Sequence, residues 1–121
     1  MRHLLLLLLM VAPTAVRAQI LDPDRCWSCR DTYYHAVAGA TLDVAVRSGV
    51  IATSWRSSPV RRVALVFVVG AAYEGVETFS AWENHKLGTR GYGFGLKDLS
   101  ADVGGAVLTE LLTAVWRAIR R

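Results

Sequence analysis

Three pairs of ionisable side chains have a spacing of three or four residues, which places both members of a pair on one face of a helix. The pairs are Asp31 with His35, Glu74 with Glu77, and Asp98 with Asp102. Histidine with carboxylates suits zinc or manganese, and a histidine held by a carboxylate suits general-base chemistry. The same residues also fit a polar network in which His35 locks three helices together. We favour that structural interpretation, because a catalytic metal site usually contains more than one histidine, and we predict no cofactor.

The two cysteines form a second motif. Cys26 and Cys29 are three residues apart, and exported cysteines tend to be oxidised, so the pair could close a small loop before the first helix. Thiol-disulfide exchange is disfavoured because no strand-helix alternation is visible, and haem attachment because Arg30 stands where a histidine is needed. A zinc site that adds His35 and His85 has irregular spacing. We predict a structural disulfide or two unreactive thiols.

A glycine-rich segment precedes the last apolar stretch. Its sequence, LGTRGYGFG, lacks the Lys-Ser/Thr ending of a phosphate-binding P-loop. The glycines are Gly88, Gly91, Gly93 and Gly95. The segment is therefore predicted to be a connecting loop and not a nucleotide site.

Three apolar segments, separated by two polar connections, predict three helices that position these residues. The expected ranges are Asp31–Ile51, Pro59–Trp82 and Asp98–Ile119. Asp43 and Arg47 form an i,i+4 pair on a separate face of the first helix, Pro59 suits a first helical turn, and the Asp98 carboxylate can cap the third helix. Short connections favour antiparallel neighbours, so the predicted fold is all-α, a small up-down-up three-helix bundle.

This topology separates charges along the bundle. One end collects Asp22, Asp24, Asp31, His35, Glu74, Glu77, Glu83, Asp98 and Asp102, and the other collects Arg47, Arg56, Arg61, Arg62, Arg117, Arg120 and Arg121. We therefore expect His35 to lie close to Glu74 and to at least one of Asp98 and Asp102, at the end opposite Arg61 and Arg117. Helix dipoles do not explain Arg61 and Arg62, because positive charge is unfavourable at the start of a helix. These arginines suggest that this end of the bundle faces an anionic membrane surface.

The first residues resemble a secretory leader. A basic start is followed by the nine-residue apolar run Leu4 to Ala12 and by small residues up to Ala18. We predict cleavage after Ala18, which leaves a short segment, 19–30, and a helical domain, 31–121. The net charge of +4 includes two leader arginines, so nucleic acid is not an expected partner. The expected location is the cell envelope, periplasmic or membrane-associated.

A membrane or membrane surface is the expected partner, in one of two ways. In the second predicted helix, the uncharged apolar run from Val63 to Tyr73 is only about 16 Å long, which is shorter than the core of a bilayer. In the first predicted helix, Asp43 and Arg47 would each cost about 2.5–3.5 kcal/mol at the centre of a membrane unless they pair. Insertion and a periplasmic bundle resting on the membrane therefore both remain open.

The order of the polar motifs resembles a known pattern. Three motifs occur in order: Asp31-Thr-Tyr-Tyr-His35 with Gly39, then Gly70-Ala-Ala-Tyr-Glu74, then Gly93-Phe-Gly-Leu-Lys-Asp98-Leu-Ser-Ala-Asp102-Val-Gly-Gly105. Together they resemble VanZ-like proteins and YfiM-type periplasmic lipoproteins over about residues 31–112. The resemblance implies a small helical membrane or envelope protein in which these acids and His35 fill the family's polar positions. Asp102 stands where VanZ-like proteins usually have asparagine, and the lipobox cysteine of the YfiM type is missing.

We therefore predict an envelope-associated helical protein of this type with a structural or interaction role; its protein partner is not identified by the sequence. The alternative is a metal- or carboxylate-dependent envelope hydrolase that uses Asp31, His35, Glu74 and Asp102.

Overall fold

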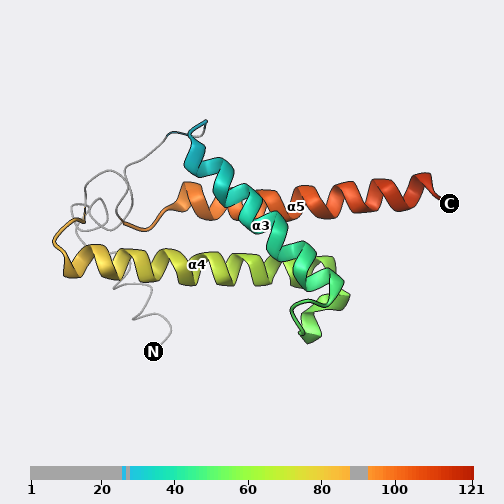
Figure 1. Ribbon diagram of the computed structural model, residues 1–121, viewed down its shortest axis with the longest axis horizontal. Helices are drawn as coiled ribbons and strands as arrows, with labels where there is room; N and C mark the ends of the chain where they lie inside the picture. Colours follow the sequence, from blue (N-terminus) through green and yellow to red (C-terminus); the bar gives the residue numbers. More distant parts are fainter. Residues whose placement is uncertain (1–25, 27, 88–92) are drawn as a thin grey trace, which may run out of the picture.

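The computed structural model describes residue 26, residues 28–87 and residues 93–121. This part of the chain contains three α-helices and one short 3-10 helix and no strand (Figure 1). The helices are α3 (Arg30–Ser48), η1 (Ser54–Ser57), α4 (Pro59–Glu83) and α5 (Leu96–Ile119). The predicted all-α three-helix bundle is confirmed. The predicted leader, its cleavage after Ala18, and Gly88 and Gly91 lie outside the described residues.

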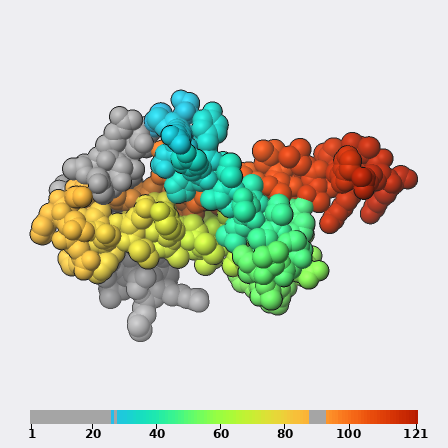
Figure 2. All heavy atoms as spheres, in the orientation of Figure 1, coloured from blue at the N-terminus to red at the C-terminus, as the bar shows by residue number. Residues whose placement is uncertain are grey.

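The three helices alternate in direction, as expected for an up-down-up bundle. α4 and α5 run antiparallel beside each other, and α3 crosses the pair obliquely (Figure 1). The main packing partner of α3 is α5, and its packing against α4 is lighter. The carboxyl-terminal end of α5 projects beyond the other helices (Figure 2).

Glycine sets the end of α3 earlier than predicted. Gly49 has a φ of 85° and donates its N–H to the carbonyl of Val46, which stops the helix at Ser48. The predicted extension to Ile51 is therefore wrong. The left-handed conformation of the cap directs the chain toward η1, and the chain then enters α4 with Pro59 in its first turn as predicted.

The start of α5 also differs from the prediction. The helix begins at Leu96, so Asp98 lies inside its first turn, and Asp98 does not cap it. The preceding residue, Gly95, donates its N–H to Oε2 of Glu74 at 2.7 Å. A carboxylate from α4, and not one from α5 itself, therefore fixes the beginning of α5.

Two glycines allow α3 and α5 to touch backbone to backbone. A Cβ atom on Gly39 would collide with the carbonyl oxygen of Asp102, and one on Gly105 would collide with the carbonyl oxygen of Ala36. Small residues at such crossings permit the closest helix approach. The crossing therefore fixes the register between the first half of α3 and the first half of α5.

The distribution of polar and apolar side chains is inverted relative to a soluble bundle. The buried stripe of α4 repeats every four residues and carries charge near both ends: Arg62, Val66, Gly70 and Glu74. Large apolar side chains such as Phe67, Val68 and Val76 point outward instead. Both α4 and α5 are long and apolar enough to cross a membrane, and most of each apolar stretch is exposed.

Candidate functional site

The centre of the site is a histidine-aspartate pair that joins α3 to α5. Nδ1 of His35 lies 3.3 Å from each carboxylate oxygen of Asp102. The Gly39 crossing explains the pair, because Gly39 touches the backbone of Asp102 and His35 lies one turn earlier on the same face of α3. A proton on Nδ1 would point at Asp102 and leave Nε2 available to a ligand.

Two more carboxylates lie beside this pair. They are Asp31, one turn before His35 on α3, and Asp98, one turn before Asp102 on α5. One carboxylate oxygen of each and one ring nitrogen of His35 all lie within 4.8 Å of one another. Asp31 is exposed, His35 is partly buried and Asp98 is buried. Solvent exposure therefore decreases from Asp31 through His35 to Asp98 across the contact between α3 and α5.

Glu74 extends the acidic region toward α4. Only 2% of Glu74 is exposed, and its Oε1 has no hydrogen-bond partner among the described residues. A Cβ atom placed on Gly95 would lie 2.7 Å from Oε2 of Glu74 and 2.8 Å from Oδ2 of Asp98. The two carboxylates thus approach the same point, while Lys97 Nζ lies 3.3 Å from the other oxygen of Asp98.

The acids also act on the protonation of His35. Burial lowers the pKa of His35, but the hydrogen bond and charge of Asp102, together with the charges of Asp98 and Asp31, outweigh it, so the pKa lies above 6.5. The site therefore favours a positive charge at His35.

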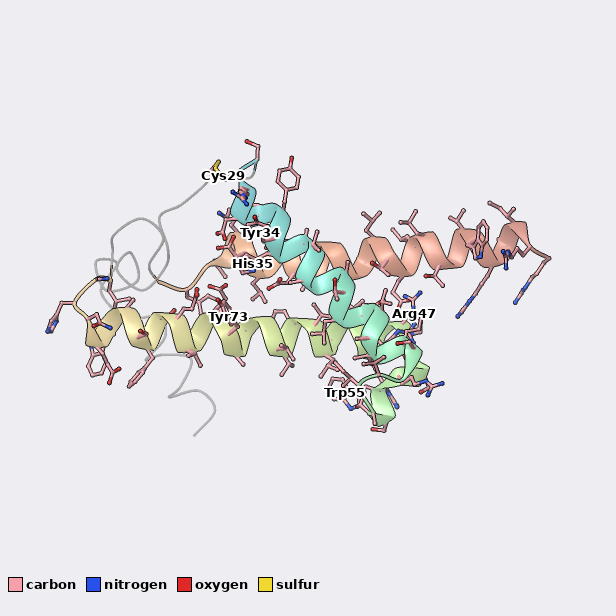
Figure 3. All side chains as sticks on the ribbon, in the orientation of Figure 1. Cys29, Tyr34, His35, Arg47, Trp55 and Tyr73 are labelled. Atoms are coloured by element: carbon pink, nitrogen blue, oxygen red, sulfur yellow. A yellow bond between two sulfur atoms is a disulfide. The ribbon has the colours of Figure 1, made fainter. Side chains whose placement is uncertain are left out.

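A pocket of about 360 Å³ opens beside the pair, between α3 and α4. Its polar end is formed by Asp31, His35 and Asp102, and its remainder is mainly apolar. The Tyr73 ring meets the His35 ring edge-on at 6.3 Å, and Figure 3 shows both side chains between their helices. The site is thus a small amphipathic pocket with an acid-base group at one end.

Most residues of the predicted cluster come together here. Asp31, His35, Asp98 and Asp102 lie side by side, and Glu74 adjoins Asp98. His35 hydrogen-bonds Asp102, while Glu74 bonds the backbone of Gly95 and interacts with His35 by charge only. Exposed Glu77 instead lies beside the hydroxyl of Tyr73.

Sequence reasoning missed Tyr73, Lys97 and Gly95. Two of them had a signal in the sequence: Tyr73 stands four residues before Glu77, and Lys97 stands beside Asp98, which are spacings that allow side-chain contact. Gly95 was assigned to a loop, and its role as a backbone donor to Glu74 has no sequence signature.

A second polar cluster lies toward the other end of the bundle and contains two of the arginines predicted there, Arg47 and Arg62. Arg62 Nη2 lies 2.6 Å from Glu110 Oε1, and Arg62 Nε lies 3.5 Å from Asp43. Arg47 contacts Asp43 at 2.6 Å and Glu110 at 3.0 Å. Asp43 is fully buried, so its predicted pair with Arg47 faces the interior and not a separate face. Arg62 at a helix start is explained by ion pairing, and a membrane surface is not needed to explain it.

The amino-terminal cysteines are joined. Cys26 and Cys29 form a disulfide with a Cα–Cα distance of 5.4 Å, and the hydroxyl of Thr32 donates to the carbonyl of Cys26. Both sulfur atoms are used in this bond. A zinc site built from these cysteines with His35 and His85 is therefore wrong.

Comparisons with known proteins return no match: no family model, no curated protein and no solved structure resembles this chain.

Proposed function

We propose that the chain is a membrane-integrated envelope protein of VanZ/YfiM type with a structural or interaction role. The observation that carries this proposal is the inverted burial: Glu74 and Asp43 are among the largest fully buried side chains, whereas Phe67, Val68 and Leu112 are half exposed. In water, an apolar surface of this extent is an association site. In lipid it is the surface that a helix needs, with polar groups paired inside.

Length supports the same assignment. The exposed apolar residues of α4 run from Val60 to Trp82, which corresponds to about 33 Å of helix, and a bilayer core is about 30 Å thick. Tryptophans lie near the ends, at Trp82 of α4 and Trp116 of α5, where interfacial aromatic residues are favoured.

The resemblance noted in the sequence supports the family part of the proposal. Its polar motifs come from three separate segments, and Asp31, Glu74 and Asp98 lie in one region with His35 and Asp102.

Carbonate washing of membranes from cells that express the full chain tests integration. We expect the protein to stay in the membrane pellet and to be released by detergent alone. Recovery in the carbonate wash would show a peripheral protein and would overturn the proposal.

Intact-mass measurement of the same material also tests export, because cleavage after Ala18 gives a chain that starts at Gln19.

A second candidate function is an envelope hydrolase, and it is favoured by the His35–Asp102 pair in a pocket. An oriented imidazole can act as a general base on water or on a substrate hydroxyl. Purified protein would be assayed with a panel of esters and phosphoesters. Activity that is lost in His35→Gln and kept in His85→Gln would support an enzyme; activity equal in both variants would eliminate it.

A further inference from the structure

We propose that Asp31, His35 and Asp98 bind one divalent metal ion, zinc or manganese, and that Asp102 orients His35 from behind. This inference goes beyond the proposed function, because it requires neither membrane insertion nor hydrolysis. One imidazole and two carboxylates, each with a donor atom within 4.8 Å of the others, form its basis.

The donor set and its spacing suit such an ion. Zinc accepts imidazole nitrogen and carboxylate oxygen at about 2.0–2.2 Å, which places tetrahedral ligands about 3.4 Å apart. The donors of Asp31, His35 and Asp98 therefore need only small side-chain rotations to close around an ion. Asp31 and His35 lie on adjacent turns of α3, and Asp98 reaches them from α5, so the backbone already holds all three.

Asp102 occupies the position of an outer-shell partner. Metal-binding histidines usually hydrogen-bond a carboxylate through their second ring nitrogen, which fixes the tautomer and the ring orientation. His35 Nδ1 faces both oxygens of Asp102 at 3.3 Å. Nδ1 is engaged by this contact, so Nε2 would be the donor to the proposed ion.

Charge provides an independent reason for a cation. Four carboxylates, of Asp31, Glu74, Asp98 and Asp102, adjoin one imidazole and the ammonium group of Lys97. Carboxyl groups therefore outnumber basic groups here by four to two. The buried Oε1 of Glu74 has no hydrogen-bond partner among the described residues. Oε2 of Glu74 and Oδ2 of Asp98 both lie beside Gly95. A buried unpaired carboxylate is expensive unless a cation or a proton compensates it.

Three protein donors leave a coordination position open. Structural zinc sites use four protein ligands, and sites with three keep one position for water or substrate. His35 and Asp31 also line the 360 Å³ pocket, so a ligand in that pocket could reach the open position.

The test uses the full chain, purified in mild detergent, stripped with a chelator and titrated with zinc or manganese chloride. We expect one ion per chain. His35→Gln and Asp31→Asn should each weaken binding at least tenfold, and Asp102→Asn should weaken it by about 10–100-fold through the outer shell. Asp31 is exposed, so its variant keeps the fold. His85→Gln and Glu83→Gln change an exposed histidine and an exposed carboxylate outside the site and should bind as the unmodified chain does.

Cobalt(II) gives a second readout, because its visible absorption spectrum reports the ligands directly. The spectrum should change in His35→Gln and stay the same in His85→Gln. Absence of stoichiometric binding would overturn the proposed metal site. Equal metal affinity in the His35 variant, the Asp31 variant and the unmodified chain would also overturn it. In either case the excess carboxylates would be compensated by shared protons. A metal-binding chain without hydrolytic activity would retain the site and remove the enzyme candidate.

Discussion

Glu74 connects two helices with one carboxylate. It lies on α4, accepts the backbone N–H of Gly95 in front of α5, and is almost completely buried. The neighbouring acid on the same helix, Glu77, is exposed. These two glutamates looked equivalent in the sequence, and only the phase of α4 against α5 distinguishes them.

Replacement of Glu74 by alanine should lower the free energy of unfolding by about 1–3 kcal/mol, since the N–H of Gly95 loses its acceptor in a buried position. Glu77→Ala is the matched control and should change stability by less than about 0.5 kcal/mol. Denaturant unfolding in detergent, followed by circular dichroism, measures both. Equal effects would mean that the contact with Gly95 contributes nothing specific.

Adjacent arginines provide a second contrast. Arg62 is buried against Glu110 and Asp43, whereas Arg61 is exposed. Removal of one partner from a buried ion pair typically costs about 3–5 kcal/mol, because the remaining charges lose their compensation. Arg62→Ala should therefore be strongly destabilising and Arg61→Ala nearly neutral, as judged by thermal unfolding. If the Arg62→Ala protein were as stable as the Arg61→Ala protein, the ion-pair cluster around Arg62 would not contribute to stability.

At the scale of elements, glycines control the contact between α3 and α5. Gly105 touches the backbone of Ala36, while the adjacent Gly104 has open space where a Cβ would lie. Both occur in the same Gly-Gly step of one helix, so their intrinsic helix propensities are the same.

Gly105→Ala should disrupt the crossing and lower stability by about 1–3 kcal/mol, as overpacking does in a tight contact. Gly104→Ala should be neutral or stabilising by up to about 1 kcal/mol, since alanine favours helix more than glycine does. Thermal unfolding of the two variants gives the comparison. A Gly105→Ala protein that is as stable as the Gly104→Ala protein would show that the two helices can move apart at this point without cost.

The sequence predicts the helices well and their ends less well. Apolar periodicity identified all three helices, and Pro59 marked a start correctly, because both signals are local. Gly49 was not recognised as the end of α3, although a glycine in the left-handed conformation at a helix end is a local signal. Gly95 was not recognised as the start of α5, because its bond to Glu74 depends on the packing of another helix. The His35–Asp102 contact was predictable in outline from helix phase. Its detail was not, because the Gly39 crossing decides which acid His35 meets.

At the scale of the whole molecule, charge is gathered inside and apolar surface lies outside. Two internal polar clusters, one around His35 and one around Arg62, lie at different levels of α4, and the apolar positions between them face outward or line the pocket. Two of the seven arginines predicted at the opposite end, Arg47 and Arg62, pair with Asp43 and Glu110 inside the bundle. The other five remain exposed: Arg56, Arg61, Arg117, Arg120 and Arg121.

A lysine on the outer face of α4 tests this view. Val68 is 53% exposed near the middle of the helix, and Val60 is 77% exposed near its start. Val68→Lys should reduce the fraction of protein that resists carbonate washing, because a lysine at a membrane centre costs about 2.5–3.5 kcal/mol. Val60→Lys should leave that fraction unchanged, because its amine can reach the interface. Equal extraction of the two variants would contradict insertion of α4.

The Arg62 cluster also imposes an order of events during synthesis. Arg62 precedes its main partner Glu110 by 48 residues, which at about 5–20 residues per second means a wait of about 2–10 s. Asp43 is made before both and lies against Arg62 in the finished bundle. Until Glu110 is made, Asp43 faces both Arg47 and Arg62, so one positive charge of the nascent α3–α4 hairpin has no counterion within this cluster.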